Sequence, residues 1–279
     1  MAFPSLLPNR QMANLFIKKL GLRAPLSDAD RQALEQATAK VVQVEAHRDL
    51  ISQGDAPEHA FIILDGFACR YKLLPDGSRS IVAYLIPGDG CDLHASILNQ
   101  MVHSIGTLTP CSVAAIPYRT VKELAAYHPN IYKALWWSVL VDEAILQEWL
   151  VGVGRRSADK QVAHFLCEMM VRLEAVGIIR GNSYKLPITQ SELADTAGIS
   201  HVHVNRVLQN LKSLRLVDQK WRSLVLLDIE ELKRFSGFAP DYLHLRPSRT
   251  EESLIEPLTD VAKSQLQMRQ RGQRDKGMF

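Results

Sequence analysis

The sequence predicts an α+β fold in which an N-terminal β-roll of the jelly-roll type precedes a long dimerisation helix and a C-terminal winged helix-turn-helix. Three observations predict it. Short apolar runs alternate with turn signals over residues 41–117, an apolar helical segment covers 130–153, and two short helical segments meet at Gly198. The 279 residues suffice for about two domains. We expect the following parts: a sensor domain over 1–120, a dimerisation helix and hinge over 121–154, a winged helix-turn-helix domain over 155–245, and a disordered polar tail over 246–279.

Composition excludes several protein classes. A charged fraction of 23% excludes a disordered or collagen-like chain. The 4 cysteines are scattered without a Cys-x-x-Cys pair, which argues against a disulfide scaffold or a zinc finger and fits a reducing cytosol. Pro4, Pro8 and Arg10 break up any signal peptide, and acidic residues interrupt the apolar stretch 134–154. We therefore expect a cytoplasmic protein with no membrane segment.

The net charge of +3 is small but unevenly distributed. Residues 155–245 contain 13 basic and 10 acidic side chains, whereas residues 1–154 contain 13 basic and 15 acidic side chains. A basic excess confined to the C-terminal part is expected if only that part binds a polyanion.

The N-terminal part is predicted to contain a short helix followed by strands. Residues 27–40 read as a helix with Ser27 as its N-cap. Over residues 41–117, β-branched runs recur about every 8–12 residues between Gly-Asp and Pro-Asp-Gly turns, which is typical of an antiparallel barrel or jelly roll. Helical periodicity returns at Val121.

The segment 130–153 reads as one long helix with a two-helix seam. The seam residues, at alternating spacings of three and four, are Tyr132, Leu135, Val139, Asp142, Leu146, Trp149 and Val153. The other faces are apolar as well, so the helix must be covered on two sides, which its own β-domain and a second copy of the helix would do. The alternative is a helix buried within one domain. Gly152, Gly154 and the charged residues 155–160 are predicted to form a hinge before a second amphipathic helix at 158–177.

Residues 188–214 carry the spacing of a helix-turn-helix. Thr189 and Glu192 form a capping box, Gly198 supplies the positive φ of a tight turn, and Ser200 caps the next helix. Ala194 is small at the position where the two helices cross. A generic helical hairpin is the alternative.

If residues 200–212 form a recognition helix, its outward residues can reach base edges or phosphates in a major groove. These candidate DNA-binding residues are Ser200, His201, Val202, His203, Asn205, Arg206 and Gln209. Arg206 is the best candidate for reading a base, because arginine pairs bidentately with guanine. Two short strands joined at 220–223 are predicted to form a wing, with Lys220 and Arg222 on phosphates.

The order of these parts resembles the CRP/FNR superfamily of bacterial transcription regulators over residues 30–235. The segments that carry the resemblance are AFIILDG (60–66), PDGSRSIVAYLIPGD (75–89) and TQSELADTAGISHVHVNRVLQNL (189–211). The resemblance implies a homodimer that binds pseudo-palindromic double-stranded DNA, contacts RNA polymerase if it is an activator, and is not an enzyme.

The resemblance also locates an effector pocket for a small molecule. The residues of this pocket differ from those of the members that bind cyclic AMP. Members that bind cyclic AMP follow the Pro-Gly-Asp turn with Gly-Glu-Leu and later carry Arg-Ser/Thr-Ala; here the matching pocket residues are Asp92, Leu93, His103 and Ser104. His103 stands where an arginine would hold the cyclic phosphate, and an imidazole lacks the planar fork of a guanidinium. We therefore expect a signal other than cyclic AMP.

Several other readings of the β-region remain open. The oxygen-sensing members use an N-terminal cysteine cluster, and this chain has no cysteine before Cys69, so we expect no iron–sulfur cofactor. Asp92, His94 and His103 could hold a metal in a cupin-like enzyme, and Cys91 could be a redox thiol, but we expect neither a metal nor another cofactor. A sensor or scaffold that uses the helix-turn-helix to bind a protein is a further alternative.

Overall fold

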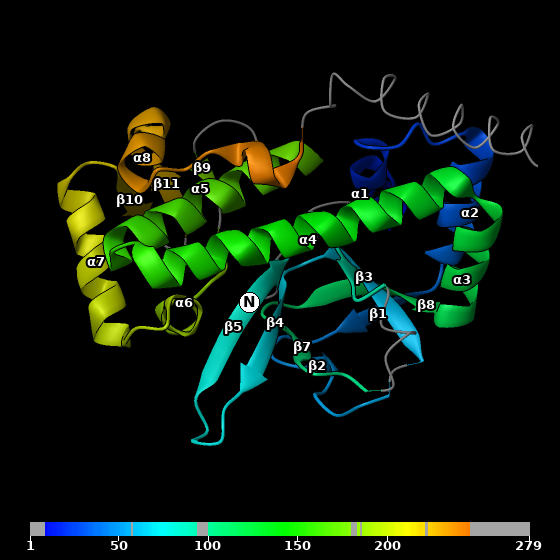
Figure 1. Cartoon of the computed structure of the whole chain (residues 1–279), viewed down its shortest axis with the longest axis horizontal. Coiled ribbons are helices and arrows are strands. Elements are labelled where there is room, and N and C mark those ends of the chain that lie inside the picture. The colour runs from blue at the N-terminus through cyan, green and yellow to red at the C-terminus, as the bar shows by residue number, and fades with distance from the viewer. Residues whose placement is uncertain are drawn as a thin grey trace, which may run out of the picture. The chain divides into compact units, whose positions relative to one another are not determined.

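The structure, a computed structural model, describes residues 9–56, 58–93, 100–179, 183–184, 186–220 and 223–245 (Figure 1). The N-terminal part holds eight strands in two antiparallel four-stranded sheets, ordered β1-β8-β3-β6 and β2-β7-β4-β5. The strands are β1 Val41–Val44, β2 Asp49–Ile51, β3 His59–Asp65, β4 Ala68–Leu73, β5 Arg79–Leu85, β6 Gly90–Cys91, β7 Ser104–Thr107 and β8 Cys111–Pro117. The predicted β-roll is therefore confirmed.

The β-roll is closed by apolar side chains that the two sheets turn toward each other. Ile62 on β3 pairs in register with Ala114 on β8, and both are fully buried. Ile105 on β7 is equally buried in the same cluster. Gly66 connects β3 and β4 at a φ of 87°, and a Cβ there would collide with the Pro110 carbonyl oxygen, so this turn requires glycine.

Two helices precede the strands, and only the second was predicted from the sequence. Helix α2 spans Asp28–Ala37, and Ser27 caps it through a capping box with Asp30. Helix α1 spans Asn9–Gly21 and buries Phe16, Ile17 and Leu20 in the core of the β-roll. Their i, i+1, i+4 spacing was the available signal for this helix.

Helix α3 (Tyr118–Tyr127) leads into α4 (Pro129–Arg155), which has 27 residues. The predicted hinge is corrected in detail: α4 continues through Gly152 and Gly154, and the chain leaves the helix at Arg156. The predicted seam is also wrong in part. Leu135 and Trp149 pack against the chain's own core, and Asp142 bonds to Arg70, so these three positions face inward.

The large apolar residues that α4 leaves exposed follow a stripe that shares three residues with the predicted seam. They are Tyr132, Trp136, Leu140, Leu146, Leu150, Val151 and Val153. We call this set the α4 stripe.

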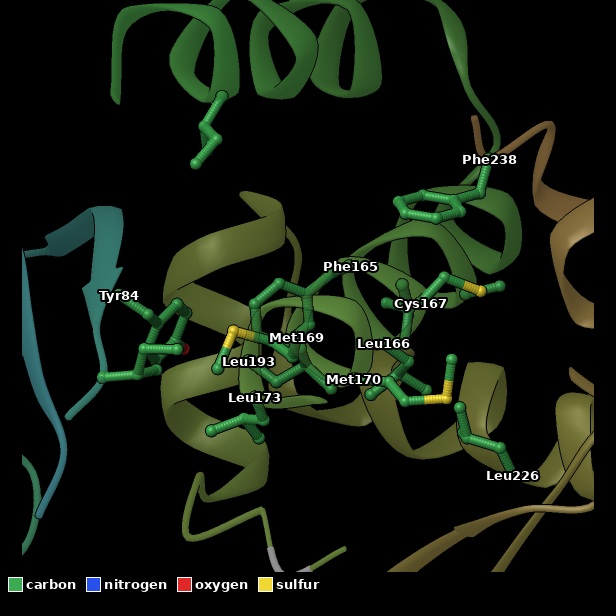
Figure 2. Close-up of a cluster of buried hydrophobic side chains, with 14 of the residues drawn as sticks. Tyr84, Phe165, Leu166, Cys167, Met169, Met170, Leu173, Leu193, Leu226 and Phe238 are labelled. Atoms are coloured by element: carbon green, nitrogen blue, oxygen red, sulfur yellow. The ribbon is translucent and has the colours of Figure 1, made fainter. Parts of the chain in front are cut away.

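The C-terminal part is helical with a small sheet. Its elements are α5 Ala158–Val176, β9 Ser183–Tyr184, α6 Gln190–Ala197, α7 His201–Ser213, β10 Val217–Lys220, β11 Ser223–Leu226, α8 Ile229–Ser236 and the 3-10 helix η2 Pro240–Leu243. Met169 and Met170 of α5 lie among leucine and phenylalanine side chains in the core (Figure 2). The same view shows Tyr84 of β5 reaching this core, where its ring lies 5.1 Å from that of Phe165.

None of the helices in the described part of the chain is both long and apolar enough to span a membrane. The predicted tail, residues 246–279, lies outside the described residues.

Candidate nucleic-acid interface and sensor site

The turn between α6 and α7 has the local bonding that the sequence predicts. The Thr189 hydroxyl accepts from the Glu192 amide at 3.1 Å, and the Glu192 carboxylate accepts from the Thr189 amide at 2.6 Å. Gly198 ends α6 in the left-handed region at φ 65°. The Ser200 hydroxyl accepts from the His203 amide at 3.2 Å and caps α7. These bonds satisfy amides that a helix N-terminus would otherwise leave without partners.

The inner face of α7 holds the helix against α5 and α6. Val204, Val207 and Leu211 are buried, and Ala194 of α6 is buried in the same cluster. Leu208, on the same side of the helix, is half-buried. A rigid helix-turn-helix core follows from this packing, because apolar residues at i, i+3 and i+7 cover one face of the helix.

The outer face of α7 carries most of the predicted DNA-binding residues. Those that are exposed are Ser200, His201, Val202, Asn205, Arg206 and Gln209. Val202 is 78% exposed, which is unusual for an apolar side chain and suits contact with a thymine methyl group. His203 is half-buried. Asn210 is exposed on α7 as well. The residues predicted from the sequence to bind DNA did not include it, although it is an amide side chain four residues after Arg206.

The wing beside α7 is formed by β10 and β11, which pair from Val217 with Leu226 to Lys220 with Ser223. Strand β9 adds to β11 as a third strand. Trp221 and Arg222 lie outside the described residues, and for Lys220 only the backbone is described. The predicted phosphate contacts of Lys220 and Arg222 therefore stay predictions.

The structure brings two of the four predicted pocket residues into contact. Asp92 is buried with a φ of 48°, and its Oδ2 lies 2.8 Å from His103 Nε2. Ser104 is buried and turns away, accepting from the Gln53 amide at 2.9 Å. Leu93 is buried in the apolar cluster of the β-roll.

A residue that sequence reasoning missed, Arg70 of β4, lies at the centre of this site. Its Nη1 donates to Asp142 Oδ2 at 3.0 Å, its Nε lies 3.3 Å from Asp92 Oδ1, and its Nη2 donates to the Gly90 carbonyl oxygen at 3.4 Å. Burial lowers the pKa of the Arg70 guanidinium, but Asp142 and Asp92 outweigh it and raise that pKa above its ordinary value. The signal in the sequence was a charged residue two positions beyond Ala68, on the face of the strand that alternation turns inward.

Strand pairing explains how Arg70 comes to point inward. Arg70 pairs with Ile105 of β7 and lies two residues beyond Ala68, and both Ile105 and Ala68 are fully buried in the core of the β-roll. Because alternate residues of a strand face the same side, Arg70 lies on the inner face of its sheet. The register shift between β4 and β5 falls only after Arg70, between Arg70 and Tyr71.

The redox and metal readings receive no support from the described residues. Cys91 is fully buried, and burial raises the pKa of its thiol well above the ordinary value, which keeps the thiol protonated and unreactive. Within the ranges that the structure describes, no group of three or more His, Cys, Asp or Glu side chains could hold a metal ion. His94 lies outside those ranges.

Comparisons with known proteins agree with this geometry. Residues 160–235 match the Crp-like helix-turn-helix domain family, and residues 41–128 match the cyclic nucleotide-binding domain family. The nitrogen fixation regulation protein FixK of Bradyrhizobium diazoefficiens is 31% identical over 167 residues, which cover 58% of this chain and 68% of FixK. The transcriptional activatory protein AadR of Rhodopseudomonas palustris is 26% identical over 205 residues, which cover 72% of this chain and 82% of AadR.

The solved structure of FixK2 from Bradyrhizobium japonicum has the same fold. The TM-score is 0.65 at 22% sequence identity, and the match covers 72% of this chain and 98% of that chain. The two domain matches, the identity to FixK and the helix-turn-helix geometry lead to one conclusion. The chain belongs to the CRP/FNR superfamily of transcription regulators and carries the helix-turn-helix DNA-binding domain of that family.

Proposed function

We propose that this regulator binds a pseudo-palindromic operator as a homodimer, with one α7 in the major groove of each half-site. The observation that carries the proposal is the exposed outer face of α7, with Val202, Asn205, Arg206 and Gln209 free of the core. A two-fold protein dimer reads two half-sites about 34–36 Å apart, one turn of the DNA helix. Such a regulator acts in the cytoplasm, where the chromosome is, and does so as a binding protein rather than as an enzyme.

The α4 stripe supports the homodimer. Trp136 is 51% exposed and Leu150 is 72% exposed, although both are large and apolar. A second copy of α4 would remove this stripe from water, and each buried Å² of apolar surface contributes about 25 cal/mol. Since α4 leads into α5 and the helix-turn-helix, the angle between two α4 helices would set the spacing of the two α7 helices. RNA polymerase would be a further partner if the regulator is an activator.

DNA selection followed by binding measurements tests the proposal. Fragments selected from random DNA should share an inverted repeat. Arg206→Ala should weaken binding to the selected site by about 1–3 kcal/mol and relax the preference at one base pair of each half-site, because a bidentate arginine–guanine pair is lost. Arg119→Ala, which removes an exposed arginine of α3, away from the helix-turn-helix, is the matched control and should leave affinity unchanged.

Two outcomes would count against the proposal. Selection that enriches no DNA would favour the scaffold alternative. Selected DNA that Arg206→Ala binds as tightly as the unmodified protein would remove the assigned role of Arg206.

A further inference from the structure

We propose that Asp142 of α4 serves as the built-in anionic partner of Arg70, so that the regulator reaches its DNA-binding arrangement without a cyclic nucleotide. This inference rests on the proposed function and specifies its regulation. The guanidinium of Arg70 lies between Asp142 of α4 at 3.0 Å and Asp92, beside β6, at 3.3 Å. A carboxylate of the protein itself, that of Asp142, is thus already paired with the guanidinium that an anionic ligand would need as its partner.

The residues of this site do not fit a cyclic phosphate. A phosphate is held by cationic donors, preferably by the fork of an arginine. Here Arg70 already faces two carboxylates, and His103 bonds to one of them, Asp92. A phosphate approaching Arg70 would come close to both carboxylates, and like charges at such distances repel.

The ion pair joins the sensor sheet to the helix that carries the α4 stripe. Arg70 and Asp142 are 72 residues apart in the chain. The Arg70 side chain is 11% exposed and that of Asp142 is 33% exposed, so the pair is partly shielded from solvent. Screening by salt is weaker for such a pair than for a surface pair. Leu146 of the stripe lies one helical turn beyond Asp142, so a fixed Asp142 fixes the direction in which the stripe faces.

The same bonds connect α4 to the turn that follows β5. Arg70 Nη2 donates to the carbonyl oxygen of Gly90, next to Asp89. The Asp89 carboxylate accepts from Arg172 of α5 at 2.8 Å. The ion pair therefore lies in a bonded path from the β-roll to the helix that supports α6 and α7. In this arrangement Asp142 acts as a positioning residue for the DNA-binding helices.

Chemical rescue tests the proposal. Asp142→Ala retains Cβ and removes only the carboxylate, so formate matches the missing group in size and charge. In chloride buffer we expect this variant to bind selected DNA at least about tenfold more weakly, within the usual range of coupling between sites. Replacing chloride by formate at constant ionic strength should restore binding. Constant ionic strength matters because DNA affinity itself falls with salt.

Four comparisons make the result specific. The unmodified protein should bind DNA equally well with and without cyclic AMP or cyclic GMP. Glu174→Ala, an acid-to-alanine change at an exposed position of α5, should bind DNA as tightly as the unmodified protein, both in chloride and in formate. The double variant Arg70→Ala, Asp142→Ala should not be rescued by formate. If Asp142→Ala does not fold, Asp142→Asn, which keeps the shape without the charge, is measured in chloride buffer alone and should bind selected DNA at least about tenfold more weakly than the unmodified protein.

A second readout separates this inference from the proposed function. Formate should raise the melting temperature of Asp142→Ala, and of neither the double variant nor the unmodified protein, whether or not DNA is bound. Loss of DNA binding by every protein, with the melting shift intact, would refute the proposed function and keep the ion-pair site. Full binding by Asp142→Ala in chloride, no rescue by formate, or a requirement for a cyclic nucleotide would overturn the inference.

Discussion

Arg79 of β5 and Asp195 of α6 form an ion pair at 2.8 Å that joins the sensor sheet to the first helix of the helix-turn-helix. The bond is reinforced nearby, where the Tyr84 hydroxyl lies 2.7 Å from the Thr196 hydroxyl oxygen. Arg79 and Asp195 both keep contact with solvent. Because solvent reaches both side chains, the pair holds the sensor sheet and the helix-turn-helix together only weakly.

The first prediction concerns the strength of this pair. Partly exposed ion pairs contribute only about 0.2–1 kcal/mol. We expect Arg79→Ala to lower the free energy of unfolding by no more than that amount, measured by urea denaturation. A double-mutant cycle with Asp195→Ala isolates the interaction. A coupling energy of zero would show that the two side chains do not interact in solution.

The second prediction concerns the α4 stripe. Leu150→Glu places a charge near the C-terminal end of the α4 stripe, on the surface that we expect a second chain to cover. Because burying an unpaired charge is costly, the variant should be a monomer at concentrations where the unmodified protein is a dimer. Light scattering coupled to size-exclusion chromatography measures this. Tyr127→Glu, at an exposed aromatic residue of α3 outside the stripe, is the control and should stay dimeric.

The third prediction compares Gly198, which has a left-handed backbone conformation, with Gly154, which lies in a right-handed α-helix. Gly198 has a φ of 65°, so Gly198→Ala should destabilise the fold by about 1 kcal/mol, the cost of left-handed backbone for an L-residue. Gly154 lies inside α4, and there alanine should instead stabilise by about 1 kcal/mol. In neither place would the added Cβ meet a described neighbour within 4 Å. Thermal unfolding of the two variants should therefore shift in opposite directions, and shifts of the same sign would contradict this backbone argument.

The fourth prediction concerns pH. His164 of α5 is buried, with its ring 5.0 Å from that of Phe238 and 5.9 Å from that of Tyr242. Burial, aided by Arg156, lowers the pKa of His164 to about 4 from an ordinary 6.5. Between these two values the unfolded chain binds a proton that the folded chain does not. Stability should therefore fall as the pH falls from about 6.5 to about 4, by at most about 3 kcal/mol.

Urea denaturation at several pH values across this window checks the fourth prediction. His164→Phe keeps an aromatic ring but cannot take up the proton, so its stability should depend less on pH. His201→Phe, at an exposed position of α7, should keep the pH profile of the unmodified protein. Identical profiles for the unmodified protein and His164→Phe would exclude His164 as the cause.

Most of the helix-turn-helix could be predicted from sequence because its determinants are local. The caps at Thr189 and Ser200 bond to amides three residues ahead, and Gly198 supplies a backbone angle that other residues rarely adopt. Val204 and Val207 are buried because helical periodicity puts them on one face. The same reasoning separates the exposed residues of α7 from the buried ones.

The face of α4 and the pairing of Arg70 were decided only by the tertiary structure. A helix that is apolar on nearly every face has no polar side to show which part meets its own domain, so the predicted seam mixed inward and outward positions. Arg70 meets Asp142 across 72 residues of chain, and the alternation that turns Arg70 inward does not tell which distant carboxylate it meets. By itself, the sequence determined most of the elements, the caps of α2, α6 and α7 and the outer face of α7, since these depend on neighbours a few residues away. Which side α4 presents, and which carboxylates surround Arg70, depend on how distant segments pack together.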